Sequence, residues 1–284
     1  MSYVEALEQA RAVMARDDAA IAPYARTMLL EHGEKRPWSI VLLHGLTNNP
    51  GQFAAFAPEL AKLGHNVFVP RMPYHGYADR LTNDIAKLTA ADLINASNEA
   101  VDIAGGLGER VAVLGISLGG ISCAYLGQYR DDVSVSVPIA PDFGVLHFLH
   151  GFTHMLAFAL WVLPNFFLWW DPRVREKQKP LTAYPRFATK ALLASLQMAE
   201  KVYSIARRSA PKAGRIATVV NVLDPAVSNV VTKEVVDAWK ARRASGIEYI
   251  ELTGLPENHD IIDPQNPLAA TNIVYPKLIE ILNL

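Results

Sequence analysis

The stretch that decides the fold is residues 111–120, which read VAVLGISLGG. Its first four residues form an apolar run typical of a buried strand, and a helical pattern begins directly after Ser117. The turn between them carries the pentapeptide G-x-S-x-G at residues 115–119. A serine in such a tight strand-to-helix turn is forced into strained backbone geometry that lifts its hydroxyl clear of the sheet. The stretch therefore predicts a nucleophilic serine, Ser117, at the carboxyl end of a strand.

Apolar runs alternate with helical patterns on both sides of this stretch. Besides the run at 111–114, the candidate strands are Trp38–Leu43, Asn66–Val69, Val133–Ile139, Ile216–Val222 and Ile247–Leu252, with residues 26–31 as a further edge strand. Continuous apolar runs are typical of strands buried on both faces, and their alternation with helices is typical of parallel sheets. The sequence therefore predicts the α/β fold class, with a mostly parallel sheet covered by helices on both faces.

The spacing of the predicted strands is broken once. About 75 residues separate the strand that ends near Ala140 from the strand that starts near Ile216, far more than an ordinary crossover needs. This long segment is rich in helical patterns and in aromatic residues. We therefore expect a core formed by residues 1–141 and 215–284, with residues 142–214 inserted as a helical cap or lid.

Five aromatic residues lie within ten positions of the expected cap: Trp161, Phe166, Phe167, Trp169 and Trp170. A lid over an acyl-binding pocket needs such side chains, because lipid-like chains require an apolar wall. Packing of the cap onto the core needs them as well, and the sequence leaves both interpretations open. We expect Trp161, Phe166 and Phe167 to contact the substrate, which favours an apolar ester over a sugar or a charged molecule.

A serine nucleophile needs a histidine base and an acid that orients the base. His259 fits the base because it lies in the loop that follows the predicted strand Ile247–Leu252. Asp224 fits the acid because it lies at the exit of the preceding strand, and it gives the chain order Ser, Asp, His. A rival acid is Asp142, at the exit of the strand Val133–Ile139. The predicted catalytic residues are Ser117, Asp224 and His259.

The tetrahedral oxyanion of acyl transfer needs backbone N–H donors. One donor should be Leu118, the residue after the nucleophile. The other should come from the loop after the strand Trp38–Leu43, which reads HGLTNNPG from His44 to Gly51. We assign this second oxyanion-hole donor to Leu46. We expect His44, at the end of the strand, to make a structural hydrogen bond rather than to act as the base.

Composition excludes several other classes of protein. A single cysteine leaves no disulfide framework and no CxxC metal or redox site. A net charge of −1 argues against a nucleic-acid partner. His147, His150 and His154 would share one face of a helix, but no carboxylate stands at the HExxH spacing, so we expect packing rather than a metal site. The expected chemistry requires no metal and no organic cofactor.

The N-terminus and the longest apolar segment bear on where in the cell the protein is located. Acidic residues near the N-terminus do not read as a signal peptide, and this predicts a cytoplasmic enzyme. Residues 143–170 are long and uncharged, but three histidines and a Pro–Asn step disfavour a stable membrane span. We expect contact of this segment with a lipid interface at most, and a small apolar ester as the molecular partner.

These motifs together carry a resemblance. The chain resembles the α/β-hydrolase superfamily, and within it the bacterial carboxylesterases and monoacylglycerol-lipase-like enzymes, over about residues 38–140 and 215–284. The matching pieces are His44-Gly45-Leu46-Thr47, Pro73-Tyr74-His75-Gly76, Gly115-Ile116-Ser117-Leu118-Gly119-Gly120, Asp224-Pro225 and His259-Asp260. The second piece departs from the Gly-His-Gly core that is more usual in that group, a difference at the rim of the site.

The resemblance implies a serine carboxylic-ester hydrolase that acts on apolar acyl esters through an acyl-enzyme. An acylglycerol lipase, a thioesterase and an acyltransferase share the same machinery and stay open as alternatives. A different class is a non-catalytic module that binds hydrophobic ligands on the same fold. No part of the resemblance extends over the expected cap, where the substrate is selected.

Overall fold

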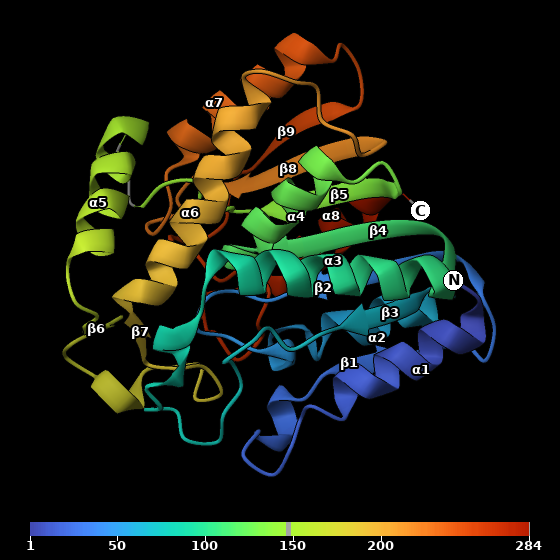
Figure 1. Ribbon diagram of the computed structural model, residues 1–284, viewed down its shortest axis with the longest axis horizontal. Helices are drawn as coiled ribbons and strands as arrows, with labels where there is room; N and C mark the ends of the chain where they lie inside the picture. Colours follow the sequence, from blue (N-terminus) through green and yellow to red (C-terminus); the bar gives the residue numbers. More distant parts are fainter. Residues whose placement is uncertain (146–148, 284) are drawn as a thin grey trace.

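The computed structural model describes residues 1–145 and 149–283. Its centre is a seven-stranded sheet in the order β1-β3-β2-β4-β5-β8-β9 (Figure 1). The strands are β1 Met28–Leu30, β2 Arg36–Leu43, β3 Asn66–Val69, β4 Gly108–Ile116, β5 Val133–Ile139, β8 Arg215–Asn221 and β9 Ile247–Leu252. The edge strand β1 is antiparallel to β3, and every other pairing in this sheet is parallel. The predicted mostly parallel sheet is therefore confirmed.

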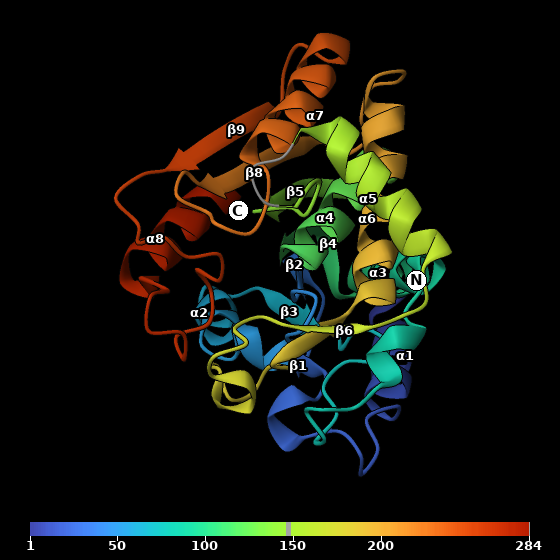
Figure 2. The same ribbon diagram turned by 90° about the vertical axis from the view of Figure 1, so that its left-hand side faces the viewer.

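The helices lie on both faces of the sheet. They are α1 Tyr3–Met14, α2 Phe56–Lys62, α3 Ala90–Leu107, α4 Leu118–Tyr129, α5 His150–Val162, α6 Thr189–Ala206, α7 Asn229–Arg242 and α8 Thr271–Leu282. One apolar core joins the sheet to α3, α4, α6 and α7, with α1 packed against α3, and the other joins it to α2 and α8. Figure 2 shows α2 and α8 on the side of the sheet opposite α3 and α6.

Alternate residues of the central strands feed the two cores. In β4, Val111 and Val113 face the first core, whereas Ala112 and Leu114 face the second. Side chains of successive strand residues point to opposite faces, so a strand covered on both faces must be apolar throughout. This explains why the strands appear in the sequence as continuous apolar runs rather than as alternating ones.

The segment between β5 and β8 contains two different parts. Helix α6 packs against α4, and its residues Met198 and Val202 are fully buried in the first core. Helix α5 contacts α6 on its outer side and buries only Thr153 and Leu160 (Figure 1). Between them, β6 Phe167–Trp169 and β7 Arg186–Ala188 form a small antiparallel sheet. The division of the chain at residues 142 and 214 stays a prediction.

The surface of residues 149–170, which include α5 and β6, is markedly apolar. Its large side chains that are more than a third exposed include Leu149, Phe152, Met155, Phe158, Trp161, Val162, Leu163, Phe166, Leu168 and Trp170. Nevertheless, no helix within residues 1–145 and 149–283 has the length and hydropathy that a membrane span requires.

The helix α4 crosses β2 at extremely short range. A Cβ atom added to Gly119 would lie 1.9 Å from the carbonyl oxygen of Leu43, a distance that no real contact allows. The crossing therefore depends on a glycine, and it brings the start of α4 close to the ends of β2 and β4.

Replacing Gly119 with alanine should therefore destabilise the fold. We expect Gly119→Ala to lower the free energy of unfolding by about 3 kcal/mol or more, because backbone atoms must move apart. The measurement is urea unfolding followed by circular dichroism. The matched control is Gly105→Ala in α3, where an added Cβ meets nothing within 4 Å and should stabilise the helix by about 0.5–1 kcal/mol. Equal stability of Gly119→Ala and the unmodified protein would contradict the close crossing.

Candidate active site

Ser117 occupies the turn between β4 and α4. Its φ is 59° and its ψ is −114°, a conformation that residues with side chains rarely adopt. The turn is fixed by a hydrogen bond of 2.9 Å from the Ser117 N–H to the carbonyl of Ile139, at the end of the neighbouring strand β5. Gly115 and Gly119 make the turn possible, since a Cβ on Gly115 would lie 2.5 Å from the Gly119 carbonyl oxygen. The result is a partly exposed serine side chain at the N-terminus of a helix.

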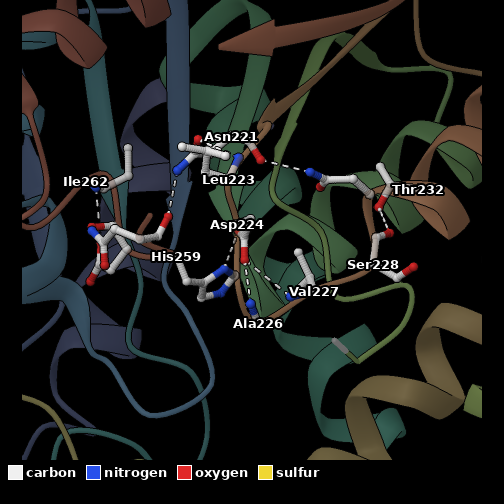
Figure 3. Close-up of polar contacts among 12 residues, drawn as sticks. Asn221, Leu223, Asp224, Ala226, Val227, Ser228, Thr232, His259 and Ile262 are labelled. Carbon is white, nitrogen blue, oxygen red and sulfur yellow. Dashed lines mark hydrogen bonds and ion pairs between the residues drawn. The ribbon is translucent and has the colours of Figure 1, made fainter. Parts of the chain in front are cut away.

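His259 and Asp224 are brought together by the adjacent strands β8 and β9. The Nδ1 of His259 lies 2.7 Å from Oδ2 of Asp224 (Figure 3). The other carboxylate oxygen accepts hydrogen bonds from the N–H groups of Ala226 (2.8 Å) and Val227 (3.2 Å). Asp224 is fully buried, whereas the His259 side chain is 24% exposed. A carboxylate can only accept, so Nδ1 carries the hydrogen and the neutral ring presents its lone pair on Nε2.

The surroundings of His259 favour its charged form. Burial lowers the pKa of His259, but the carboxylates of Asp224, Asp260 and Asp142 raise it more, and the net pKa lies above the usual value of 6.5. These negative charges thus stabilise the imidazolium even though the ring is largely shielded from solvent. Such a group is suited to accept a proton during a reaction and to hold it briefly.

The loop that carries His259 is held by Asn221, at the end of β8. The side-chain amide of Asn221 donates to the carbonyls of Pro256 (2.9 Å) and Asn258 (2.8 Å), and the residue is fully buried (Figure 3). Reasoning from the sequence missed this residue. The only signal was a polar residue inside the apolar run 216–222, close to Asp224.

The predicted oxyanion loop lies against the serine turn. A Cβ added to Gly45 would be 3.7 Å from Cβ of Ser117, and Leu46 is 5% exposed. Within the described part of the chain, neither the N–H of Leu46 nor that of Leu118 donates a hydrogen bond to a protein group. A buried N–H without a partner is rare in folded proteins, so these two donors are available to a ligand atom.

Two buried histidines, His75 and His44, make contacts that hold this loop in place. The Nε2 of His75 contacts the carbonyl oxygen of Leu46, and burial lowers the pKa of His75 to about 4, which keeps it neutral. The Nε2 of His44 accepts a hydrogen bond of 3.1 Å from the Met72 N–H, which is the structural hydrogen bond expected for this residue. Burial likewise holds the pKa of His44 well below its usual value.

Gln52 and Asp260 connect the oxyanion loop to the His259 loop. The side chain of Gln52 accepts from the Gly45 N–H at 2.9 Å and donates to Oδ2 of Asp260 at 2.9 Å. Asn48 donates to the same carboxylate oxygen at 3.2 Å. The two contacts to Asp260 join residues more than 200 positions apart, so sequence spacing could not reveal them.

Asp142, the rival acid, takes a different partner. Its Oδ2 accepts a hydrogen bond of 3.0 Å from the hydroxyl of Ser195 on α6, and its N–H donates to the Ser117 carbonyl at 3.4 Å. The residue is 6% exposed. In this structure the acid in direct contact with His259 is Asp224.

A cavity of about 690 Å³ lies between α5 and α6. Trp161 is part of its wall, together with Phe143, which directly follows Asp142. Its remaining apolar wall residues include Ala157, Phe158, Leu193 and Leu196. Phe166 and Phe167 are not part of this wall: Phe166 contacts Thr189, and the guanidinium of Arg186 lies over the Phe167 ring at 4.2 Å.

The histidines of α5 take part in ordinary side-chain contacts. His150 lies 2.8 Å from a Glu200 carboxylate oxygen and stacks on the Tyr203 ring with 3.5 Å between the ring centroids. His154 lies 3.8 Å from the same oxygen, and His147 lies outside the described residues. Over the described ranges, no three His, Cys, Asp or Glu side chains are grouped so as to hold a metal ion.

Comparisons with known proteins agree with this architecture. A thermostable monoacylglycerol lipase from Bacillus sp. (strain H-257) is 29% identical over 108 residues, which span 38% of this chain and 42% of the length of that relative. The structure of a metagenome-derived lipolytic enzyme, from work on LipS and LipT, superposes with a TM-score of 0.68 at 16% identity, covering 93% of this chain and 99% of the other. The monoacylglycerol lipase of Paleococcus ferrophilus superposes with a TM-score of 0.65 at 17% identity, covering 89% and 98%.

At sequence identities of 16% and 17%, the similarity of these two structures to this chain shows the fold alone. The decisive comparison is with a family model described as the alpha/beta hydrolase fold, which matches residues 39–207. This match includes the serine turn, the oxyanion loop and α6, and it extends over more than half of the sequence. The chain therefore belongs to the α/β-hydrolase family.

Proposed function

We propose that this protein is a serine carboxylic-ester hydrolase that acts on apolar acyl esters. The observation that carries the proposal is the 2.7 Å contact between His259 and Asp224. It lies at the carboxyl ends of the strands, where Ser117 occupies its strained turn. All three residues follow the carboxyl ends of parallel strands of one sheet: Ser117 follows β4, Asp224 follows β8 and His259 follows β9. Serine, histidine and aspartate are the three residue types that carry out acyl transfer in serine hydrolases.

The proposed reaction has two steps. Oγ of Ser117 attacks the ester carbonyl carbon while Nε2 of His259 takes the hydroxyl proton, and Asp224 stabilises the imidazolium. The imidazolium then gives the proton to the leaving alcohol, and the acyl group stays on Ser117. In the second step, His259 removes a proton from water as the water oxygen attacks the acyl carbon, and the imidazolium then returns this proton to Oγ of Ser117 as the bond between Oγ and the acyl carbon breaks and the carboxylic acid is released.

The N–H groups of Leu46 and Leu118 are proposed to hold the oxyanion. Support comes from the absence of any protein acceptor for either donor within the described residues, and from the position of Leu118 at the first turn of α4. The positive end of the α4 dipole adds to the stabilisation of negative charge there. His75 supports the loop by its contact with the Leu46 carbonyl, which fixes the orientation of this part of the backbone.

The cavity between α5 and α6 is proposed to receive the acyl chain. Its volume of about 690 Å³ falls in the range of small-molecule sites, and its wall combines apolar side chains with polar and charged ones such as Glu200 and Lys201. Trp161 belongs to this wall, and contact of Trp161, Phe166 and Phe167 with the substrate stays a prediction. The exposed apolar side chains of α5 support contact with a lipid surface, from which such a substrate would come.

Among esters, an acylglycerol is favoured by the name of the curated relative, a monoacylglycerol lipase. Thioester hydrolysis and acyl transfer to another alcohol would use the same residues. A non-catalytic binding module is disfavoured, because it would need neither an imidazole held by a buried carboxylate nor a serine in a strained turn.

Hydrolysis of p-nitrophenyl esters tests the proposed function. We expect the unmodified protein to hydrolyse them and Ser117→Ala to lose about 10³-fold or more in kcat, because the nucleophile is gone. The matched control is Ser122→Ala in α4, the helix that follows Ser117: it removes a buried hydroxyl that has no hydrogen-bond partner among the described residues, and it should change kcat less than about 2-fold. Full activity of Ser117→Ala, or none in the unmodified protein on any ester, would refute the proposal.

Filling the cavity tests the acyl site separately. Ala157→Trp should lower kcat/KM for a dodecanoate ester about 10-fold or more and leave the acetate ester nearly unchanged, because the added indole occupies space needed by a long chain. Met155→Trp serves as the control, since Met155 is on the same helix and 69% exposed. An equal effect of both variants, or of Ala157→Trp on all chain lengths, would place the acyl chain elsewhere.

A further inference from the structure

The segment between β6 and β7 is hydrogen-bonded to the loop that carries the proposed oxyanion donor. The indole N–H of Trp170 donates to the hydroxyl oxygen of Thr47 at 2.9 Å, and the backbone N–H of Tyr184 donates to the Thr47 carbonyl at 2.8 Å. Two positions further on, the side-chain amide of Asn49 donates to the carbonyl of Thr182 at 2.8 Å. The predicted cap is thus fastened to the oxyanion loop by residues that are distant in the chain.

Thr47 belongs to the tight turn that presents the Leu46 N–H. The N–H of Asn48 donates to the Gly45 carbonyl at 3.1 Å, which closes a four-residue turn with Leu46 and Thr47 at its corners. In a trans peptide the carbonyl and the N–H point in opposite directions. Because the Gly45 carbonyl is bonded inside the turn, the Leu46 N–H of the same peptide points out of it, toward no acceptor among the described residues.

The residues of this turn are held from two sides. The Leu46 carbonyl is contacted by His75, which is fully buried. The carbonyl and the hydroxyl of Thr47, the next residue, are held by Tyr184 and Trp170. The Leu46 N–H can change its direction only if the neighbouring peptides turn as well. Contacts that fix Thr47 therefore restrict the motion of the donor.

The Trp170 side chain is placed for its contact by local packing. Its ring centroid lies 4.4 Å from that of Phe187, and its backbone N–H donates to the Pro185 carbonyl at 3.2 Å. The indole Nε1–H can only donate, and a threonine hydroxyl oxygen can accept. Although Trp170 is 44% exposed, its one polar side-chain atom is bonded to the oxyanion loop.

We propose that Trp170 and Thr47 are positioning residues for the oxyanion hole, in which the indole N–H holds Thr47 and thereby keeps the Leu46 N–H directed at the developing oxyanion. The inference rests on the proposed function, since it takes Leu46 as an oxyanion donor. Neither side chain has to touch the substrate. An oxyanion forms on the carbonyl oxygen of every ester, so the contribution is to kcat and is independent of the length of the acyl chain.

Anchoring of the predicted cap alone would have a different kinetic signature. A loosened cap would disturb the cavity between α5 and α6 and would raise KM for a long-chain ester more than for an acetate. A loosened oxyanion turn lowers kcat and kcat/KM by the same factor for both esters, because the donor acts in the transition state.

The test compares Trp170→Phe, which removes the indole N–H and keeps a ring against Phe187, with Thr47→Val, which removes the acceptor and keeps the shape. On p-nitrophenyl acetate and dodecanoate we expect each variant to lower kcat about 3- to 10-fold and to change KM less than about 2-fold. The affinity for a trifluoromethyl ketone, which forms a tetrahedral oxyanion on Ser117, should fall by the same factor as kcat. The double variant should lose no more than either single one, because both remove the same bond.

Two further variants serve as controls. Thr47→Ser keeps a hydroxyl acceptor and should stay within about 2-fold of the unmodified protein in kcat. Trp169→Phe changes the residue before Trp170, whose ring lies beneath the guanidinium groups of Arg175 and Arg186, 6.0 and 5.9 Å from the ring centroid. It should leave kcat and the affinity for the ketone unchanged.

Unchanged kcat and ketone affinity in Trp170→Phe or in Thr47→Val would overturn the inference. An effect confined to KM for dodecanoate, or two single losses that multiply in the double variant, would overturn it as well. If circular dichroism shows that one variant is unfolded, the other decides. Ester hydrolysis that depends on Ser117 but on neither Trp170 nor Thr47 would refute this inference and leave the proposed function standing, whereas an unmodified protein that hydrolyses no ester would refute both.

Discussion

The approach of α4 to β2 is the constraint on which the rest of the structure depends. The backbone of Gly119 lies so close to the Leu43 carbonyl that no side chain fits between them. This contact sets the short turn after β4, and the turn places Ser117 at a φ of 59°. The same contact brings the loop after β2 to the serine, since Leu43 is the last residue of that strand. One backbone contact therefore positions both the hydroxyl of Ser117 and the N–H of Leu46, for which the described residues provide no acceptor.

The aspartates near the His259 loop differ in their hydrogen-bond partners and therefore in their electrostatic properties. Asp224 has both carboxylate oxygens occupied by hydrogen bonds, with two of them from backbone N–H groups. Asp260 is tied to the oxyanion loop through Gln52 and Asn48. Asp142 has a single hydroxyl partner, and its pKa is raised to about 7 by burial. Similar groups around one ring thus have different chemistry because their own partners differ.

The sheet and the serine turn could be predicted from the sequence because their signals are local. A strand buried on both faces is an apolar run, and the turn after β4 needs its glycines at fixed positions. The edge strand β1 also falls within the predicted residues 26–31. The pairing of β6 with β7 could not be predicted, since it joins residues about 20 positions apart whose apolar character is just as typical of a lid or of helix packing.

The supporting contacts of the site were not predictable either. Asn221, Gln52 and His75 each act on a loop that is distant in sequence, and nothing in their immediate surroundings indicates the partner. The predicted cap likewise contains α6, whose buried residues belong to the core between the sheet and α4. The pattern of apolar residues in α6 predicts which face of the helix is buried, but it does not predict the element against which that face packs.

The central claim is that Ser117 is a nucleophile activated by His259. Covalent labelling tests it most directly: the protein is treated with a fluorophosphonate, and its intact mass and peptide map are measured by mass spectrometry. We predict one phosphonyl group on Ser117 and labelling slowed by about 100-fold or more in His259→Ala, because the general base is lost. No adduct, an adduct on another residue, or labelling that is equally fast without His259 would contradict the claim.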